Sequence, residues 1–523
     1  MTDRMRPDAA TRYVLIALFG AAVGLRVIFL GSLPPGMFRD EAEKAYNAWC
    51  LALTGRDLAG NFLPLFINVF GVTTSAIYQY AAVPFVAVLG LNEWSARLPA
   101  AAVGSATVAV NYLYMARACG RGPALLATGF LAFSPWHILF SRWAQQGIFL
   151  PLLLSSAMLA WQAWRNGLRA GLPAAAALFS LAIYAYDVAR LFVPLLMLGL
   201  VASQWRTLLR QWRLVLVSLV VFLVVASPTI HLVLNSPAAA QARFRAISIF
   251  QDGSTPLSAA RQFAFNYLNH FSPTFLLVRG DAEWRHSAGT GHVTAFELFC
   301  LLAGLAAVGL QRKPSDRIWI WWLLLAPIPA SLTREGVPHA LRAIMFVPAI
   351  QNLAGIGAAW LLEQAPPARR SLLVRAAVLA GLAAFLPFAA SYFGPYAGRS
   401  AVNWQYGVKH ALEIADAVEP PVHRIVFYNV TGAEYLVAFY RRTPPSAIRE
   451  ADAVWTRHAF APFNAPLDRV CQAHDRHAAF IMLPVFTPPC ADKVVLIEAP
   501  RGGGPVMAVY FNDALSSPTA DIR

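Results

Sequence analysis

Two neighbouring carboxylates near the start of the chain are the side chains best suited to chemistry. Asp40 and Glu41 open the segment RDEAEKAYNAWC, shortly after the helix-terminating sequence PPG. A carboxylate in such a position can act as a general base toward a hydroxyl group. The alternative is structural, because Asp40 can cap the amphipathic segment 42–53 while Glu41 favours its positive N-terminal end. From spacing alone, both interpretations stay open.

The composition indicates the kind of element that must position these residues. Hydrophobic residues make up 58% of the 523 residues and charged residues 13%, and the mean hydropathy is +0.51. Soluble domains carry about 25% charged residues, so the chain is predicted to be a polytopic membrane protein. Five cysteines without a CxxC pair argue against a zinc or redox framework.

Hydropathy predicts eleven membrane-spanning helices, since a bilayer core requires about 20 apolar residues per helix. The expected spans are 13–32, 97–115, 122–140, 148–164, 171–186, 190–204, 213–234, 294–311, 317–332, 341–362 and 373–393. Basic residues recur at every second connection, as the positive-inside rule requires. These residues are Arg4, Arg6, Arg12, Arg117, Arg121, Arg165, Arg169, Arg206, Arg210, Arg213, Arg312, Lys313, Arg317, Arg369, Arg370 and Arg375. The N-terminus is therefore expected in the cytoplasm and the C-terminus outside. The net charge of +15 reflects this bias, and no nucleic acid partner is expected.

Residues 73–90 are also apolar, but a twelfth span there would invert every later connection. This segment is therefore predicted to be an interfacial or re-entrant helix inside the first external loop, 33–96. A second external loop covers 235–293. Together these segments make a transmembrane domain of residues 1–395.

Residues 396–523 differ in composition from the rest of the chain. The sequences HRIVFYNV, HAAFIMLP, KVVLIEAP and PVMAVYFN are typical of strands, and helical segments lie between them. We expect a small external α/β domain with an accessory role. Cys471 and Cys490 lie in it, and a disulfide between them is plausible outside the cell, although sequence does not give their separation.

Several motifs resemble those of GT-C membrane glycosyltransferases, including protein O-mannosyltransferases, lipid A aminoarabinose transferases and their bacterial relatives. FRDEAEKAYNAWCLALTGRDLAGNFLPLF is similar to their first external loop, and SARLPAAAVGSATV and SPWHILFSRWAQQG are similar to parts of their second and third spans. NHFSPTFLLVRGDAEWRHS and PIPASLTREGVPHALRAI resemble external loops of the bacterial branch. The likeness covers most of residues 10–345.

The resemblance implies transfer of a sugar from a polyprenyl phosphate such as undecaprenyl phosphate to a lipid, glycan or protein acceptor, usually with inversion. It places the active face in the periplasm, at the bacterial inner membrane. Asp40 is then the base, and Glu41 orients it or contacts the acceptor or a metal. The leaving phosphate is already anionic, so positive charge near it is needed and a general acid is not.

The candidates for binding that phosphate are basic residues at external helix ends. Arg342 and His339 lie three residues apart and could share a helix face, although an interfacial arginine can also simply snorkel. Other candidates for the phosphate are Arg334, Arg279 and His286. Possible substrate contacts are Asp281, Arg285, Arg142, Arg97 and Tyr46. Asp281 could instead pair with Arg285. Asp187 and Arg190 are interpreted as an ion pair, and His270 and His292 as ordinary loop residues.

Two departures from the family pattern bear on cofactors. Some relatives carry a second acidic residue at the external end of the third span, where this chain has Gln145-Gln146-Gly147. The aminoarabinose transferases have a lysine late in the first external loop, where this chain has GVTTSAIYQY. No cofactor is therefore predicted, although a divalent metal held by Asp40, Glu41 and phosphate oxygens stays open.

Two other functions are compatible with a polytopic chain. A transporter or flippase of lipid-linked saccharides would be expected to have internal repeats and charges at mid-span. The sequence shows no internal repeat and few charges at mid-span. A ligase of lipid-linked oligosaccharides shares the architecture and differs in its donor, an oligosaccharide on a diphosphate.

Overall fold

The computed structural model describes residues 8–311, 317–418, 421–474 and 477–512, which are mostly helical. They form two compact units, described separately below. Unit 1 contains the described residues up to Ile28, Leu65–Ile77 and Ala100–Ser391, and unit 2 contains Phe29–Pro64, Tyr78–Pro99 and the described residues from Tyr392 onward. Four basic residues of the topology argument, Arg4, Arg6, Arg312 and Lys313, lie outside the described residues.

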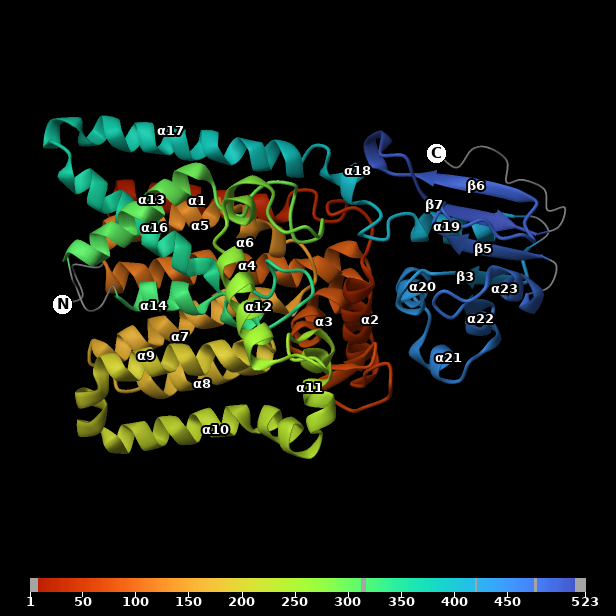
Figure 1. The fold of residues 1–523 in the computed structure, drawn as a ribbon, viewed down its shortest axis with the longest axis horizontal. Coiled ribbons are helices and arrows are strands. Elements are labelled where there is room, and N and C mark those ends of the chain that lie inside the picture. Colours follow the sequence, from red (N-terminus) through yellow and green to blue (C-terminus); the bar gives the residue numbers. More distant parts are fainter. Residues whose placement is uncertain (1–7, 312–316, 419–420, 475–476, 513–523) are drawn as a thin grey trace. The chain divides into compact units, whose positions relative to one another are not determined.

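Unit 1 is a bundle of helices (Figure 1). Its described residues also include one β-hairpin. Its elements are α1 (Ala9–Val27), β1 (Phe66–Val69), β2 (Val72–Ser75), the later part of α4 (Glu93–Ala118), α5 (Arg121–Ala132), α6 (Pro135–Phe140), η2 (Gln146–Ile148), α7 (Phe149–Arg165), α8 (Gly171–Ala185), α9 (Ala189–Arg210), α10 (Trp212–Asn235), α11 (Pro237–Ile247), α12 (Pro256–Asn269), η3 (Thr274–Val278), α13 (Ala295–Gln311), α14 (Arg317–Leu325), α15 (Ile328–Ser331), α16 (Phe346–Gln364) and α17 (Pro367–Tyr392).

Five helices in the described part of the chain are long and apolar enough to cross a membrane. They are Ala9–Val27, Gln146–Arg165, Ala189–Arg210, Trp212–Asn235 and Pro367–Tyr392. On α17 large apolar side chains such as Leu379 and Leu386 are more than 60% exposed, as expected for a helix that faces lipid. The membrane location and the helical character of the chain thus agree with the sequence, and the number of eleven spans stays a prediction.

Several expected spans are helical but interrupted. Residues 122–140 divide into α5 and α6 at Ser134, whose hydroxyl accepts a hydrogen bond from the backbone N–H of His137, before Pro135 begins α6. Residues 317–332 divide into α14 and α15. The segment predicted as 341–362 becomes helical only at Phe346, so the residues before it form turns.

Close helix packing in unit 1 depends on small residues. Helices α13 and α16 approach through Gly304 and Gly357, where an added Cβ would overlap with the backbone of the opposite helix. Such contacts are typical of helices in membranes, because lipid gives no hydrophobic force between them and close van der Waals packing must hold them together.

Unit 2 contains the acidic pair and the C-terminal sheet. Its elements are α2 (Arg39–Thr54), α3 (Ile77–Leu89), the first part of α4, α18 (Tyr396–Ser400), α19 (Val408–Asp416), β3 (Arg424–Phe427), α20 (Ala433–Arg441), α21 (Pro445–Arg449), α22 (Ala453–Thr456), β4 (His458–Phe460), α23 (Leu467–Ala473), β5 (Ala478–Met482), β6 (Lys493–Glu498), η4 (Pro500–Gly502) and β7 (Pro505–Phe511). Helix α3 has 13 residues, fewer than a span requires.

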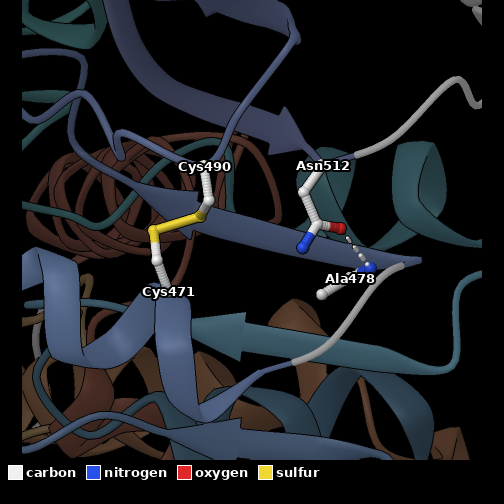
Figure 2. Close-up of a disulfide and its surroundings, with 4 residues drawn as sticks. All are labelled: Cys471, Ala478, Cys490 and Asn512. Carbon is white, nitrogen blue, oxygen red and sulfur yellow. Dashed lines mark hydrogen bonds between the residues drawn. A yellow bond between two sulfur atoms is a disulfide. The ribbon is translucent and has the colours of Figure 1, made fainter.

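The five strands form one mixed sheet in the order β4-β3-β5-β7-β6. Strands β4, β3 and β5 are parallel, and β7 pairs antiparallel with both β5 and β6. All five residues of β5 are buried, as expected for a central strand covered on both faces. Cys471 and Cys490 form a disulfide beside this sheet, with their Cα atoms 5.8 Å apart, and the Asn512 side chain accepts a hydrogen bond from the Ala478 N–H (Figure 2).

Candidate functional site

The first turn of α2 carries Asp40 with its side chain accessible. Helix α2 begins at Arg39 after Phe38 in the N-cap position, so Asp40 lies inside the first turn and does not cap the helix, contrary to the structural alternative. Its side chain is 32% exposed, and the Arg39 Nε lies 3.5 Å from Asp40 Oδ1. The helix N-terminus favours its negative charge.

Glu41 is buried and paired with Arg97. The Arg97 Nε and Nη2 atoms donate to the two carboxylate oxygens at 2.9 and 2.8 Å, and both side chains are fully buried. Arg97 also donates to the carbonyls of Leu30, Pro34 and Gly36. Arg97, named above as a possible substrate contact, thus pairs with Glu41 of the first external loop.

Glu43, which the sequence analysis did not single out, is a third carboxylate on α2 and is 1% exposed. It accepts hydrogen bonds from Gln79 at 3.0 Å and Asn47 at 2.9 Å, and Lys44 lies 3.6 Å away. Burial raises the pKa of Glu43, and Lys44 and the two amides oppose this effect. The spacing of Asp40, Glu43 and Asn47 along one helix face was the available signal.

Tyr46 is fully buried on the same helix. Its hydroxyl donates to the Thr443 carbonyl at 2.5 Å, which joins α2 to the segment after α20. Tyr46, predicted as a possible substrate contact, thus forms a hydrogen bond within unit 2.

Unit 1 contains a separate cluster built around Asp281. Asp281 Oδ2 lies 3.0 Å from His286 Nδ1 and accepts the Ala340 N–H at 2.8 Å, and Oδ1 accepts the Glu283 N–H at 2.9 Å. Burial alone would raise the pKa of Asp281, but the hydrogen bond with His286 and the other donors lower it well below its usual range. The pairing of Asp281 with Arg285, the alternative to a substrate contact, is not observed, because Asp281 pairs with His286 and Arg285 pairs with Glu283 at 3.1 Å.

His339 and Arg342 meet at this cluster without a helix. The Arg342 backbone N–H donates to His339 Nδ1 at 3.2 Å within turns that precede α16, which corrects the expectation of a shared helix face. The guanidinium of Arg342 donates to the Thr333 hydroxyl at 2.8 Å and the Glu335 carbonyl at 2.9 Å. The His286 and His339 rings are 4.6 Å apart.

Two histidines interpreted as loop residues, His270 and His292, lie in a turn and a bend, and both contact the same cluster. His270 Nε2 accepts the His339 N–H at 3.2 Å and His292 Nε2 accepts the Asp281 N–H at 3.1 Å. Burial lowers the pKa of His270 to about 4 and that of His292 to about 3. Both are therefore neutral acceptors at neutral pH. Sequence could not reveal this, because their partners lie in other segments.

The remaining predicted residues lie in varied surroundings. Arg142 is buried and donates to the carbonyls of Leu25 and Ile28 at 2.8 and 2.6 Å, so it stabilises the end of α1. Arg279 and Arg334 are exposed, and Arg334 donates to the Ala246 carbonyl at 3.4 Å. The ion pair of Arg190 and Asp187 is confirmed at 2.7 Å.

Three side chains of the cluster have the chemistry of metal ligands. One ligand atom each of Asp281, His286 and His339 lies within 4.8 Å of the others. Two imidazoles and one carboxylate suit a zinc-type ion, which these three residues would hold and which would supply positive charge. The donor set fits a divalent metal better than the pair Asp40 and Glu41, because Arg97 occupies Glu41.

Comparisons with known proteins agree with the resemblance found in the sequence. A family model described as dolichyl-phosphate-mannose-protein mannosyltransferase matches residues 73–231. No curated protein matches. The crystal structure of ArnT from Cupriavidus metallidurans in the apo state is similar over 96% of this chain and 98% of that chain, with a TM-score of 0.63 and 16% identity.

Two further solved structures extend the comparison. ArnT from Cupriavidus metallidurans bound to undecaprenyl phosphate has a TM-score of 0.61 and 15% identity, covering 96% of this chain and 98% of that chain. The archaeal oligosaccharyltransferase AglB from Archaeoglobus fulgidus, in complex with an inhibitory peptide and a dolichol-phosphate, has a TM-score of 0.50 and 12% identity, covering 83% and 63%. The resemblance to GT-C glycosyltransferases is thus confirmed, with a fold like that of ArnT.

Proposed function

We propose that this chain is an integral membrane glycosyltransferase that moves one sugar from a polyprenyl-phosphate donor to a lipid, glycan or protein acceptor. The matched family is described by a dolichyl-phosphate-mannose donor, and a structure of the same fold holds undecaprenyl phosphate. In this proposal the reaction inverts the anomeric carbon and takes place on the periplasmic side of the bacterial inner membrane.

The general base is Asp40. The observation that carries this assignment is the different environment of the three carboxylates at the start of α2. Glu41 is held by Arg97 and Glu43 is buried beneath two amides, whereas Asp40 is 32% exposed. A base needs access to the acceptor hydroxyl, and only Asp40 of these three has it.

Arg342 and His339 bind the donor phosphate. The Arg342 guanidinium is oriented by Thr333 and the Glu335 carbonyl, so it can stabilise developing negative charge without rearrangement. Asp281 and His286 hold the turn before α16 in place through the Ala340 N–H. A divalent ion held by Asp281, His286 and His339 would add positive charge for the phosphate. Arg334 and Arg279, being exposed, are secondary candidates.

The test is a donor panel with the full-length chain in lipid nanodiscs. Polyprenyl-phosphate pentoses, hexoses and aminosugars are compared with an oligosaccharide on a polyprenyl diphosphate. We expect transfer from at least one monosaccharide donor, and we expect Arg342→Gln to lower kcat/KM about 100-fold. The control Arg261→Gln, at an exposed arginine of α12 to which no role is assigned, should stay near wild type. Transfer from the diphosphate alone would indicate a ligase, and transbilayer movement without sugar transfer would indicate a flippase; either contradicts the proposal.

A further inference from the structure

A cavity lies at the end of unit 1 where basic residues gather. It has a volume of about 390 Å³ and is bounded by the end of α4, the end of α7, the middle of α9 and the start of α14. None of the residues assigned above to the reaction lines it. Cavities of this size hold small ligands or lipid headgroups.

The charge of the lining selects for an anion. Arg165 and Arg317 line the cavity from two different helices, and among the described residues that line it there is no Asp or Glu. Within the part of the chain that the structure describes, neither guanidinium has a carboxylate within salt-bridge distance; Arg165 donates to the Gln162 side chain at 3.2 Å. Two guanidinium groups beside a side-chain amide are the donors that a phosphate requires.

Aromatic residues make the remaining wall suitable for a lipid. Trp161, Trp319 and Trp321 line the cavity, and the Trp321 indole donates to the Leu195 carbonyl while 40% of the residue stays exposed. Tryptophan is enriched where hydrocarbon meets headgroups. On the same stretch of α9, Leu198 is 63% exposed, which gives an acyl chain an apolar surface.

The backbone of α9 is also irregular at this position. Gln204 lines the cavity and has φ −128° and ψ 17°, which break the helical path. The side chain of its neighbour Ser203, which also lines the cavity, donates to the Leu200 carbonyl at 2.7 Å. Polar groups of α9 thus reach the cavity where the apolar part of the helix ends.

We propose that this cavity binds the phosphate headgroup of an anionic glycerophospholipid, with Arg165 and Arg317 as the phosphate ligands. The occupant is a membrane lipid because the two guanidinium groups lie in the same cavity as interfacial tryptophans and beside an exposed apolar helix face. The positive-inside pattern places these arginines beside the anionic cytoplasmic leaflet.

The test measures lipid binding to the delipidated full-length chain. Native mass spectrometry and thermal unfolding are compared with phosphatidylglycerol, phosphatidylcholine and inorganic phosphate. We expect phosphatidylglycerol to bind and raise the unfolding temperature, with an affinity at least ten times that for phosphatidylcholine. Equal binding of both lipids, or competition by millimolar inorganic phosphate alone, would overturn the proposal.

Variants separate the cavity from general surface charge. Arg165→Gln with Arg317→Gln is expected to weaken phosphatidylglycerol binding at least tenfold, whereas the control Arg210→Gln with Arg369→Gln, also exposed and basic, is not. Should the first variant fold poorly, Ser203→Trp fills the cavity while keeping both arginines, and it is expected to weaken binding as well. Wild-type affinity in a folded Ser203→Trp or in the double arginine variant would contradict the assignment.

Discussion

At the scale of single residues, two neighbouring carboxylates differ in their exposure to solvent. Asp40 is one-third exposed, whereas Glu41, the next residue, is fully buried against Arg97. The composition and spacing of the sequence do not distinguish these two carboxylates. Only the fold distinguishes them, because the partner of Glu41 lies 56 residues away in the sequence.

The buried histidines of unit 1 lead to a prediction about pH. The pKa of His270 is lowered to about 4 and that of His292 to about 3 by burial, whereas in the unfolded chain both titrate near pH 6.5. Below pH 6.5 the unfolded chain therefore binds protons that the folded chain does not. Stability falls as the pH is lowered, by about 2 kcal/mol per histidine between pH 7 and pH 5.

This prediction is checked by thermal unfolding of the chain in nanodiscs across that pH range. His292→Asn retains an acceptor for the Asp281 N–H. It should reduce the loss of stability between pH 7 and pH 5 by the contribution of one histidine. The variant His410→Asn, at a histidine of unit 2 whose side chain is 44% exposed, serves as control and should change the slope less. An identical slope in wild type and His292→Asn would show that His292 is not kept neutral by the fold.

At the scale of elements, α2 is positioned by interactions at its N-terminus and in its middle. Arg97 holds its N-terminus through Glu41, and the Tyr46 hydroxyl ties its middle to Thr443. The helix was expected from its amphipathic spacing, and its start was placed within a few residues. The anchoring partners could not be predicted, because backbone carbonyls and distant side chains leave no local pattern.

Glu41→Gln tests this anchoring. The variant leaves Arg97 buried without its counter-charge, and removal of one partner from a buried pair costs about 3–5 kcal/mol. We expect a lower unfolding temperature and faster hydrogen exchange of the α2 amides. Arg39→Gln, which removes a partly exposed partner, should cost less than about 1 kcal/mol. Equal effects of the two substitutions would contradict the anchoring role.

The segment between α12 and α16 shows why loops are harder to predict than helices. Hydropathy predicted the bounds of α13 to within one residue, because a continuous run of apolar residues is a local signal. The cluster of Asp281, His286 and His339 instead depends on turns, and Asp281 accepts the Ala340 N–H across 59 residues. His339 and Arg342 were expected to share a helix face, but both precede α16, where the Arg342 backbone N–H donates to His339 Nδ1.

At the scale of the whole molecule, composition and the arginine pattern carry most of the prediction. The membrane character and the resemblance to GT-C enzymes follow from apolar runs and from motifs in their order along the chain. The orientation across the membrane rests on the positive-inside rule alone, and it can be tested directly.

Reporter fusions test this orientation. Alkaline phosphatase, which is active only outside the cytoplasm, is fused within residues 166–170, within 252–255 and near residue 512. We expect activity at the second and third positions and none at the first, because Arg165 and Arg169 mark a cytoplasmic connection. Activity at residues 166–170 would mean that the assigned topology is inverted.

The central claim is that Asp40 is the base of a sugar transfer, and one comparison tests it most directly. Turnover of the monosaccharide donor identified in the panel is measured for wild type, Asp40→Asn and Arg39→Gln at matched unfolding temperature. The asparagine is isosteric with aspartate but cannot accept the acceptor proton, so kcat should fall at least about 100-fold. Arg39→Gln retains the carboxylate and should retain most activity. A folded Asp40→Asn enzyme with wild-type turnover would contradict the account.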